Sequence, residues 1–233
     1  MMRQPILALD GVHKSHGRAA GTVQVLRDVS LDIRHGEVCA IVGSSGSGKS
    51  TLLSLMGLLD RPDSGRLRFE GEEVGAASAD RLAALRNRRI GFVFQAFHLL
   101  PRLTALENVA LPFLYRGVPP RVGRDRAAAM LWRVGLGDRL HHRPEEMSGG
   151  QRQRVAVARA VVGDPALLLA DEPTGNLDSA TARQIIDLFF ALNADLGVTV
   201  ALVTHDPAIA ARCGRQLVMR DGRLDSAASG GVP

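Results

Sequence analysis

Hydrophobic positions along the chain fall into two kinds of run. Four short runs are almost continuously apolar, at residues 38–42, 90–94, 166–170 and 198–203. Strands that are buried on both faces have this pattern, because neither face meets water. The four runs therefore predict an α/β fold in which helices cover both faces of a parallel sheet.

Helical periodicity marks the segments between these runs. Apolar residues recur on one face of two expected helices, at Ala127, Met130, Leu131 and Val134 in the first and at Ile185, Leu188, Phe189, Leu192 and Leu196 in the second. Residues 6–33 consist of alternating, strand-like pieces and predict a small antiparallel layer near the N-terminus. Asp221 and Gly222 lie between two short strand-like runs and predict a tight hairpin.

The segment 96–163 differs from the rest of the chain. It contains three helical patterns and no convincing strand, so it predicts a helical lobe inserted into the sheet domain. The expected organisation is a single domain over residues 1–233, with a core at 1–95 and 164–233 and the lobe at 96–163. Ser229, Gly230 and Gly231 predict a frayed C-terminal tail.

Composition narrows the class of protein. Hydrophobic residues make up 45% of the chain and aromatic residues only 4%, so aliphatic side chains must do most of the packing. The sequence has no run of eighteen apolar residues and no apolar leader after the first residues, which favours a cytoplasmic protein. Two cysteines are too few for a disulfide framework, and Cys39 lies within an apolar run as an expected core residue.

The net charge does not indicate a nucleic-acid partner. The chain carries a formal charge of +5, but its basic residues are nearly all arginines that are scattered along the sequence with few aromatics among them. Nucleic-acid binding proteins usually gather basic side chains into a patch. We therefore expect an arginine-rich solvated surface and no nucleic-acid partner.

The strongest local signal is a glycine-rich loop between a buried strand and a helical segment. Glycines allow the backbone to turn its N–H groups onto phosphate oxygens, and the helix adds the positive end of its dipole. Lys49 can then reach the β- and γ-phosphates, and the Ser50 hydroxyl can bind Mg²⁺. The phosphate-binding residues expected from this pattern are Gly43, Ser44, Ser45, Gly46, Ser47, Gly48, Lys49, Ser50 and Thr51.

A second buried run, 167–170, ends in two carboxylates, Asp171 and Glu172. The carboxyl ends of parallel strands form the edge at which α/β proteins bind ligands. Asp171 is the expected Mg²⁺ ligand, acting through water, and Glu172 is the expected general base that polarises the attacking water. An acidic pair of this kind more often caps a helix, but its place downstream of a phosphate loop favours the catalytic reading.

With these elements in place, the chain resembles the ABC ATPases. The segment 147–154, which reads Met-Ser-Gly-Gly-Gln-Arg-Gln-Arg, is similar to their signature sequence, and 171–178 resembles their extended Walker B motif and D-loop. Gln95 matches the glutamine of their Q-loop, and His205 matches their switch histidine. The motifs occur in the family's order over nearly the whole chain. The resemblance implies a P-loop NTPase (RecA-like) core with an N-terminal antiparallel β layer and an inserted α-helical lobe.

The resemblance also implies a dimer. Ser148, Gly149, Gly150 and Gln151 begin a mostly apolar helix and form a second anion site at a helix N-terminus. In the family, two subunits pack head to tail, so that each signature covers the ATP bound by the other subunit. ATP and Mg²⁺ are the implied ligands.

Further roles follow from the resemblance for four residues. Gln95 is expected to contact Mg²⁺ and the attacking water, and His205 to contact the γ-phosphate and position Glu172. Asp178 is expected to organise the facing site of the dimer. The position at which the family usually has an aromatic ring stacked on adenine corresponds to His16, whose imidazole offers less area for stacking.

The segment after Gln95 points to a subgroup. Residues 97–109 and 171–178 resemble the ATPases that serve lipoprotein release, macrolide or peptide export, and cell-division signalling. In that subgroup a separate permease transmits force across the membrane, so the ATPase is expected to be peripheral on the cytoplasmic face of the inner membrane. The apolar stretch that begins at Phe97 and ends at Leu103 is the expected docking site for the permease.

Alternatives from other classes fit the sequence less well. An ABC ATPase of DNA repair needs a long coiled-coil or hinge insertion, a translation factor usually carries two cassettes, and a small-molecule kinase lacks the signature and Gln95. One alternative stays open. An ATPase that regulates an extracytoplasmic hydrolase through its membrane partner, in place of moving cargo, would have the same motifs.

Overall fold

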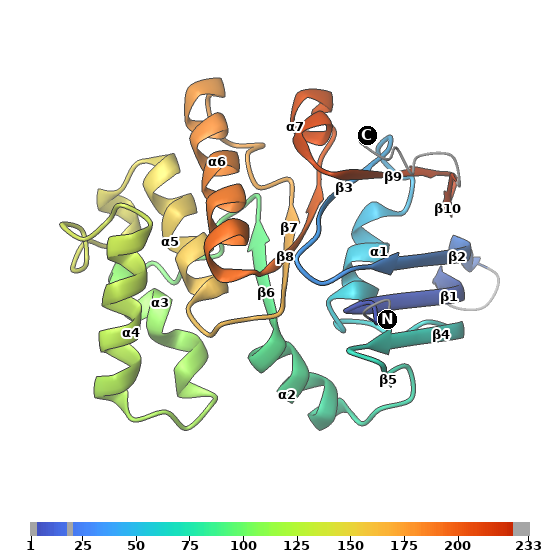
Figure 1. Cartoon of the computed structure of the whole chain (residues 1–233), viewed down its shortest axis with the longest axis horizontal. Coiled ribbons are helices and arrows are strands. Elements are labelled where there is room, and N and C mark those ends of the chain that lie inside the picture. Colours follow the sequence, from blue (N-terminus) through green and yellow to red (C-terminus); the bar gives the residue numbers. More distant parts are fainter. Residues whose placement is uncertain (1–3, 18–20, 226–233) are drawn as a thin grey trace. The chain divides into compact units, whose positions relative to one another are not determined.

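The computed structural model describes residues 4–17 and 21–225 (Figure 1). The chain divides into two compact units, one formed by residues up to Arg86 and from Thr199 onward, the other by Asn87–Val198. The tail expected at Ser229, Gly230 and Gly231 lies outside the described residues. The predicted division into a core and a helical lobe is a different partition and stays a prediction.

The first unit contains the predicted antiparallel layer. Its strands lie in the order β2 (Val23–Ile33), β1 (Leu7–His16), β4 (Ser64–Phe69) and β5 (Glu72–Glu73), and every neighbouring pair is antiparallel. Alternate residues of β1 point inward, which gives the layer one buried face. Figure 1 shows β1, β2 and β4 side by side. The hydrophobic pattern predicts the first two strands and does not predict β4 or β5.

The same unit contains parallel strands. β3 (Val38–Val42) pairs in parallel with β8 (Thr199–Val203) on one side and with β9 (Arg215–Arg220) on the other. Every residue of β8 is buried, and Cys39 in β3 is fully buried, as the apolar runs predict. β9 turns back into β10 (Arg223–Leu224) through Asp221 and Gly222, both at positive φ, so the predicted hairpin is confirmed.

Helices complete the first unit. α1 (Lys49–Met56) follows β3 and the glycine-rich loop, and α7 (Pro207–Arg212) lies between β8 and β9 in the chain. Asp206 caps α7 by accepting hydrogen bonds from the N–H groups of Ala208 and Ile209. α2 (Ala79–Arg89) contains the boundary between the two units, and only Leu82 within it is buried.

The second unit combines two strands with four α-helices. β6 (Ile90–Phe94) pairs in parallel with β7 (Leu167–Asp171). Between them in the chain lie α3 (Ala105–Leu114), α4 (Pro120–Arg133), a short 3₁₀ helix (Pro144–Glu146) and α5 (Gly149–Val161), and β7 is followed by α6 (Ser179–Leu196). The segment 96–163, all of it described, has three α-helices and no strand, as the sequence predicts. The α/β fold class is therefore confirmed.

The three helices of 96–163 share a core. It is built almost entirely from aliphatic residues together with Phe113, as the low aromatic content requires. The predicted face of α4 contributes Ala127 and Leu131, and Val134 follows directly. The predicted face of α6 is right for Ile185, Phe189 and Leu192 but wrong for Leu196, which is 38% exposed because Gly197 ends the helix directly after it in a left-handed conformation.

Candidate functional site

The candidate residues fall into two groups, one in each unit. In the first unit, Gly43 to Gly48 connect β3 to α1, and Lys49, Ser50 and Thr51 form the first turn of α1. A Cβ atom on Gly43 would lie 2.4 Å from the main-chain oxygen of Met219, so only glycine fits there. Gly48 has a φ of 103° and precedes the first residue of α1. The close packing and the left-handed turn explain why the loop needs glycine at both positions.

The loop and α1 fit an anionic ligand. Among the described residues, no side chain caps the N-terminus of α1, and its first turn carries no acidic residue. The N–H groups at a helix start need acceptors, and the helix dipole favours a negative one. Lys49 Nζ donates to the main-chain oxygens of Gly43 and Ser44, each at 2.8 Å, which holds the ammonium within the loop.

Ser47 adds a second sign of a ligand-binding loop. Its hydroxyl oxygen is buried and makes no hydrogen bond within the described part of the chain. A buried hydroxyl that makes no hydrogen bond costs free energy, so such groups often mark a place where a ligand or water completes the site. The arrangement of the loop therefore fits the phosphate groups that the sequence predicts.

His205 lies at the same sheet edge as this loop. Ile41 of β3 pairs with Val203 of β8, and the N–H of Thr204 donates to the main-chain oxygen of Ile41 at 3.1 Å. His205 follows as an exposed residue. Since the parallel strands β3 and β8 end together, the structure brings His205 to the edge at which the phosphate loop begins.

His16 also lies beside the loop. It is the last residue of β1, and its Nε2 atom lies 3.3 Å from the hydroxyl oxygen of Thr51 in the first turn of α1. The structure therefore gathers the phosphate loop, His16 and His205 within one unit.

In the second unit, β6 and β7 end together. Phe94 pairs with Asp171, so Gln95 follows one strand where Asp171 closes the other. Glu172 is next in the chain and has a φ of 45°, an unfavourable backbone conformation for a residue with a side chain. Strain of this kind is typical of residues that a functional site holds in place.

Gln95 is bound to a residue that the sequence does not single out. Its Nε2 donates to Asn176 Oδ1 at 3.1 Å, and Asn176 Nδ2 donates to the main-chain oxygen of Gln95 at 3.0 Å. A Cβ atom on Gly175 would lie 2.7 Å from Gln95 Nε2. The glutamine is thus held against the segment that follows Glu172.

The signature residues begin α5 as predicted. Ser148 caps the helix: its hydroxyl accepts from the N–H of Gln151 at 3.3 Å, and the Gln151 side chain accepts from the N–H of Ser148 at 2.9 Å. This reciprocal capping box orders the first turn. Because capping uses a lone pair of the oxygen, the Ser148 hydroxyl can still donate its proton to a ligand.

The start of α5 packs against the segment after Glu172. A Cβ atom on Gly149 would lie 3.2 Å from Leu177 Cδ2, and one on Gly150 would lie 2.5 Å from Thr181 Cγ2. The buried Gln153 donates to the main-chain oxygen of Pro173 at 2.6 Å. The signature and the 171–178 segment are therefore one packed structure within this unit.

Asp178 caps α6 in the structure. Its carboxylate accepts from the N–H groups of Ala180 and Thr181 and from the Thr181 hydroxyl, at 3.0, 3.0 and 2.6 Å. The hydrogen bonds from Thr181 lower the pKa of Asp178, so it stays ionised at neutral pH. Its expected role across a dimer remains a prediction.

Arg159 of α5 was not predicted as part of the site. It donates to the main-chain oxygens of Phe97 and His98, at 2.9 and 2.6 Å. Phe97 and His98 are consecutive residues with φ values of 57° and 48°, which is rare without glycine. The guanidinium of Arg152 lies 5.2 Å from the centre of the Phe97 ring. Arginines of the signature helix thus hold the first residues of the expected docking segment.

Metal binding would depend on the nucleotide. The described residues include no group of three or more His, Cys, Asp or Glu side chains that could hold a metal ion. Mg²⁺ in phosphate-transfer sites commonly takes one or two protein oxygens, with phosphate oxygens and water as its other ligands. Ser50 in the first unit and Asp171 in the second are each an oxygen donor of the kind that such a site uses.

Comparison with known proteins places these motifs in a family. A profile described as ABC transporter matches residues 26–175. An uncharacterized ABC transporter ATP-binding protein, YknY of Bacillus subtilis, is 50% identical over 225 residues, covering 97% of this chain and 97% of that protein. The lipoprotein-releasing system ATP-binding protein LolD of Shewanella oneidensis is 49% identical over 223 residues, covering 96% and 97%.

Other relatives are longer. A macrolide export ATP-binding/permease protein, MacB of Syntrophobacter fumaroxidans, is 50% identical over 233 residues, but the match covers 98% of this chain and 32% of that protein. The chain thus spans about a third of the length of such a relative. Among solved structures, a dimeric post-hydrolysis state of the ATP-binding cassette MJ0796 bound to ADP and Pi matches with a TM-score of 0.86 at 39% identity, covering 94% of this chain and 96% of that one.

Proposed function

Because this chain belongs to the ABC transporter family, we propose that it binds and hydrolyses Mg-ATP in a head-to-tail dimer and thereby drives a membrane permease. The observation that carries the proposal is the phosphate loop. It combines glycines that nothing larger can replace, a lysine held within the loop and a helix start without an acidic residue. Each feature favours a bound polyphosphate.

Each residue of the proposed site has a role that suits its functional group. Residues 43–51 hold the phosphates of ATP, with the Lys49 ammonium on the β- and γ-phosphates. Ser50, Asp171 and Gln95 would hold Mg²⁺, which supplies positive charge against the triphosphate when bound. Glu172 accepts a proton from the attacking water, and His205 contacts the γ-phosphate and positions Glu172.

Dimerisation supplies the remaining charge. Ser148, Gly149, Gly150 and Gln151 of one subunit would meet the γ-phosphate held by the other, with Asp178 ordering the same surface. Support comes from the ordered first turn of α5, whose capping serine keeps a hydroxyl proton to donate. The solved cassette MJ0796 is also described as dimeric. Closure of such a dimer around two ATP molecules is the motion that a permease would receive.

In this proposal, the process that the ATPase drives is export or lipoprotein release. The relatives that support this direction are named for macrolide export and lipoprotein release. The permease would dock near Phe97, Leu100 and Leu103, and the protein would be peripheral on the cytoplasmic face of the membrane. No helix in the described ranges has both the length and the apolar character that a membrane crossing needs.

Nucleotide binding is the first test. We expect wild-type protein to bind fluorescent ATP with Mg²⁺ and Lys49→Ala to bind it far more weakly, because the phosphates lose their lysine. Arg66→Ala, which removes an exposed cation outside the loop, is the matched control and should bind nearly as the wild type. Unchanged affinity of the Lys49→Ala variant would refute the assigned role of the loop.

The membrane partner is tested by co-purification. Tagged full-length Glu172→Gln protein, held with ATP and Mg²⁺, is recovered from detergent-solubilised membranes. A permease with an extracytoplasmic domain should accompany it or be part of the same chain. The type of that domain distinguishes transport from the alternative, regulation of an extracytoplasmic hydrolase. Recovery of an ATP-dependent dimer without any membrane-spanning protein would contradict the proposed coupling.

A further inference from the structure

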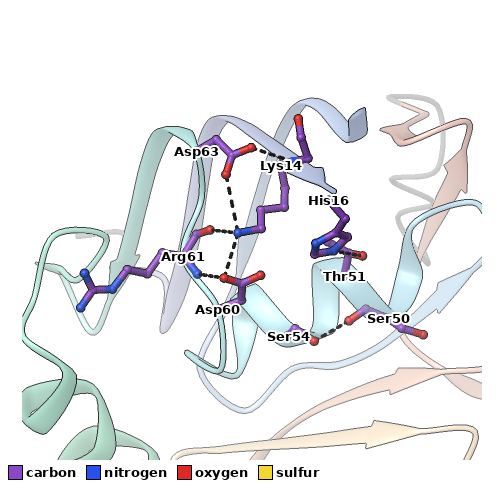
Figure 2. Close-up of polar contacts among 9 residues, drawn as sticks. Lys14, His16, Ser50, Thr51, Ser54, Asp60, Arg61 and Asp63 are labelled. Atoms are coloured by element: carbon purple, nitrogen blue, oxygen red, sulfur yellow. Dashed lines mark hydrogen bonds and ion pairs between the residues drawn. The ribbon is translucent and has the colours of Figure 1, made fainter. Parts of the chain in front are cut away.

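A cluster of charged groups fixes the end of β1 (Figure 2). Lys14 Nζ lies 2.8 Å from Asp60 Oδ1, 2.8 Å from the main-chain oxygen of Arg61 and 3.6 Å from Asp63 Oδ1. The Lys14 side chain is only 11% exposed. An ammonium group has three protons to donate and is costly to bury unpaired. Two of these oxygens accept hydrogen bonds from the ammonium, and the carboxylates of Asp60 and Asp63 balance its charge.

Backbone contacts join the same two segments. The N–H of Asp63 donates to the main-chain oxygen of His13 at 2.9 Å, and the N–H of Ser15 donates to Asp63 Oδ2 at 2.7 Å. Three consecutive residues of β1, from His13 to Ser15, are therefore attached to the loop 60–63 that follows α1.

These contacts occur where strand pairing is irregular. The register of β1 against β2 shifts between Val12 and Lys14 and again between Lys14 and Ser15. The pairing of β1 with β4 extends only to His13, opposite Ser64. A regular ladder would by itself fix the end of a strand. β1 stays paired with β2 at Ser15 and His16, but it has no β4 partner there, and the contacts of Lys14 and Asp63 attach the end of β1 on that side.

The segment fixed in this way carries His16. Two residues beyond Lys14, the imidazole of His16 lies beside Thr51 of the phosphate loop, as Figure 2 shows. We propose that Lys14 is a positioning residue for the nucleotide base: paired with Asp60 and Asp63, it holds the end of β1 so that His16 stays beside the first turn of α1 and meets the base of the bound nucleotide. The inference rests on the proposed function, in which this loop holds ATP.

Electrostatics explain why the lysine is needed. Burial by itself raises the pKa of Asp60, but hydrogen bonds from Lys14 and from the N–H of Arg61 outweigh it and lower that pKa. Asp60 and Asp63 both face the Lys14 ammonium, at 2.8 and 3.6 Å. Without the ammonium between them they repel each other, and the loop 60–63 loses its attachment to β1.

The test compares ligands with and without a base. Calorimetric titration measures Mg-ATP and Mg-tripolyphosphate binding to wild type, Lys14→Met, Lys14→Arg and Arg66→Met. Lys14→Met keeps an unbranched apolar stem and removes the charge. Arg66→Met is the matched control, since it breaks an exposed ion pair, Arg66 to Asp10 at 2.7 Å, in the same strand layer.

We expect Lys14→Met to weaken ATP binding about tenfold, the order expected when a base loses contact with a ring, and to leave tripolyphosphate binding unchanged. Lys14→Arg should recover most of the ATP affinity, and Arg66→Met should match the wild type. In a His16→Ala background, Lys14→Met should cause no further loss of ATP affinity, because the lysine acts through the histidine.

Two results would overturn the role of Lys14 and leave the proposed function standing. Equal weakening of ATP and tripolyphosphate by Lys14→Met would show a role in stability of the unit, and unchanged ATP binding would show no role. If wild-type protein bound neither ligand, the proposed function would fail as well, so the two failures are distinguishable.

Discussion

Gln95 and Asn176 hold each other by two hydrogen bonds that run in opposite directions. The Gln95 side chain donates to the Asn176 side chain at 3.1 Å, and the Asn176 side chain donates to the main chain of Gln95 at 3.0 Å. Asn176 lies four residues after Glu172, so the pair connects the expected Mg²⁺ ligand to the segment of the expected general base.

Loss of this pair should affect the chemical step more than nucleotide binding. We expect Asn176→Ala to lower kcat for ATP about tenfold, the equivalent of two hydrogen bonds of about 0.7 kcal/mol each, with ATP affinity nearly unchanged. Asn176→Asp keeps the acceptor for Gln95, so its kcat should lie between those of the wild type and Asn176→Ala. Steady-state phosphate release measures kcat, and an Asn176→Ala enzyme with wild-type kcat would contradict the role.

Arg159 should be a major source of stability in the second unit. Its two hydrogen bonds hold Phe97 and His98 at positive φ, and burial lowers the pKa of its guanidinium. We expect Arg159→Met to reduce the free energy of unfolding by about 3 kcal/mol, since hydrogen bonds from charged groups contribute about 1.5 kcal/mol each or more. Arg159→Lys, which keeps the charge but not the fork of donors, should lose less.

Denaturant titrations of the two variants measure this effect. Limited proteolysis near residues 97–103 should also become faster for Arg159→Met, because the segment loses its attachment to α5. A variant as stable as the wild type, with the same cleavage pattern, would show that other contacts hold these two residues.

The start of α3 provides a pH-dependent contribution. Thr104 and Glu107 form a capping box in which the Glu107 carboxylate accepts from the N–H and the hydroxyl of Thr104, at 2.9 and 3.0 Å. These bonds lower the pKa of Glu107 below its usual 4.5. Because the folded-state pKa is the lower one, the stabilisation is complete above about pH 4.5 and is lost as pH falls through the folded-state value.

Glu107→Gln tests this contribution. We expect it to lower the free energy of unfolding by about 0.5 kcal/mol at pH 7, because a charged acceptor near a helix start is replaced by a neutral one. The difference should shrink as pH is lowered below 4.5. Glu145→Gln, a change at an exposed carboxylate, is the control. A difference that grows with acidity would contradict the assignment.

The parts of the fold that the sequence predicts are those with an unbroken local pattern. β3, β6, β7 and β8 come from continuous apolar runs, and α5 from a capping serine ahead of an apolar helix. By contrast, β4 buries only Leu67 and Phe69 among arginines, and α2 buries only Leu82. These two elements depend on partners elsewhere in the chain, which a hydrophobic pattern does not reveal.

The same distinction applies to the candidate site. The loop at 43–51 and the pair Asp171 and Glu172 have local signatures, because adjacent residues act together. Asn176 and Lys14 do not, since their partners lie 81 and 46 residues away in the sequence. The rarity of lysine gives one sign that Lys14 has a particular role, because Lys14 and Lys49 are the only lysines in the chain.

Glu172 is the proposed general base of ATP hydrolysis in a nucleotide-dependent dimer. The direct measurement is phosphate release from Mg-ATP together with light scattering, on wild type, Glu172→Gln and the control Glu73→Gln at an exposed carboxylate of β5. We expect Glu172→Gln to hydrolyse ATP at least about a hundredfold more slowly than the wild type, as for loss of a general base. We also expect it to form an ATP-dependent dimer that persists. Hydrolysis by Glu172→Gln at the wild-type rate, or a monomer with ATP present, would contradict the account.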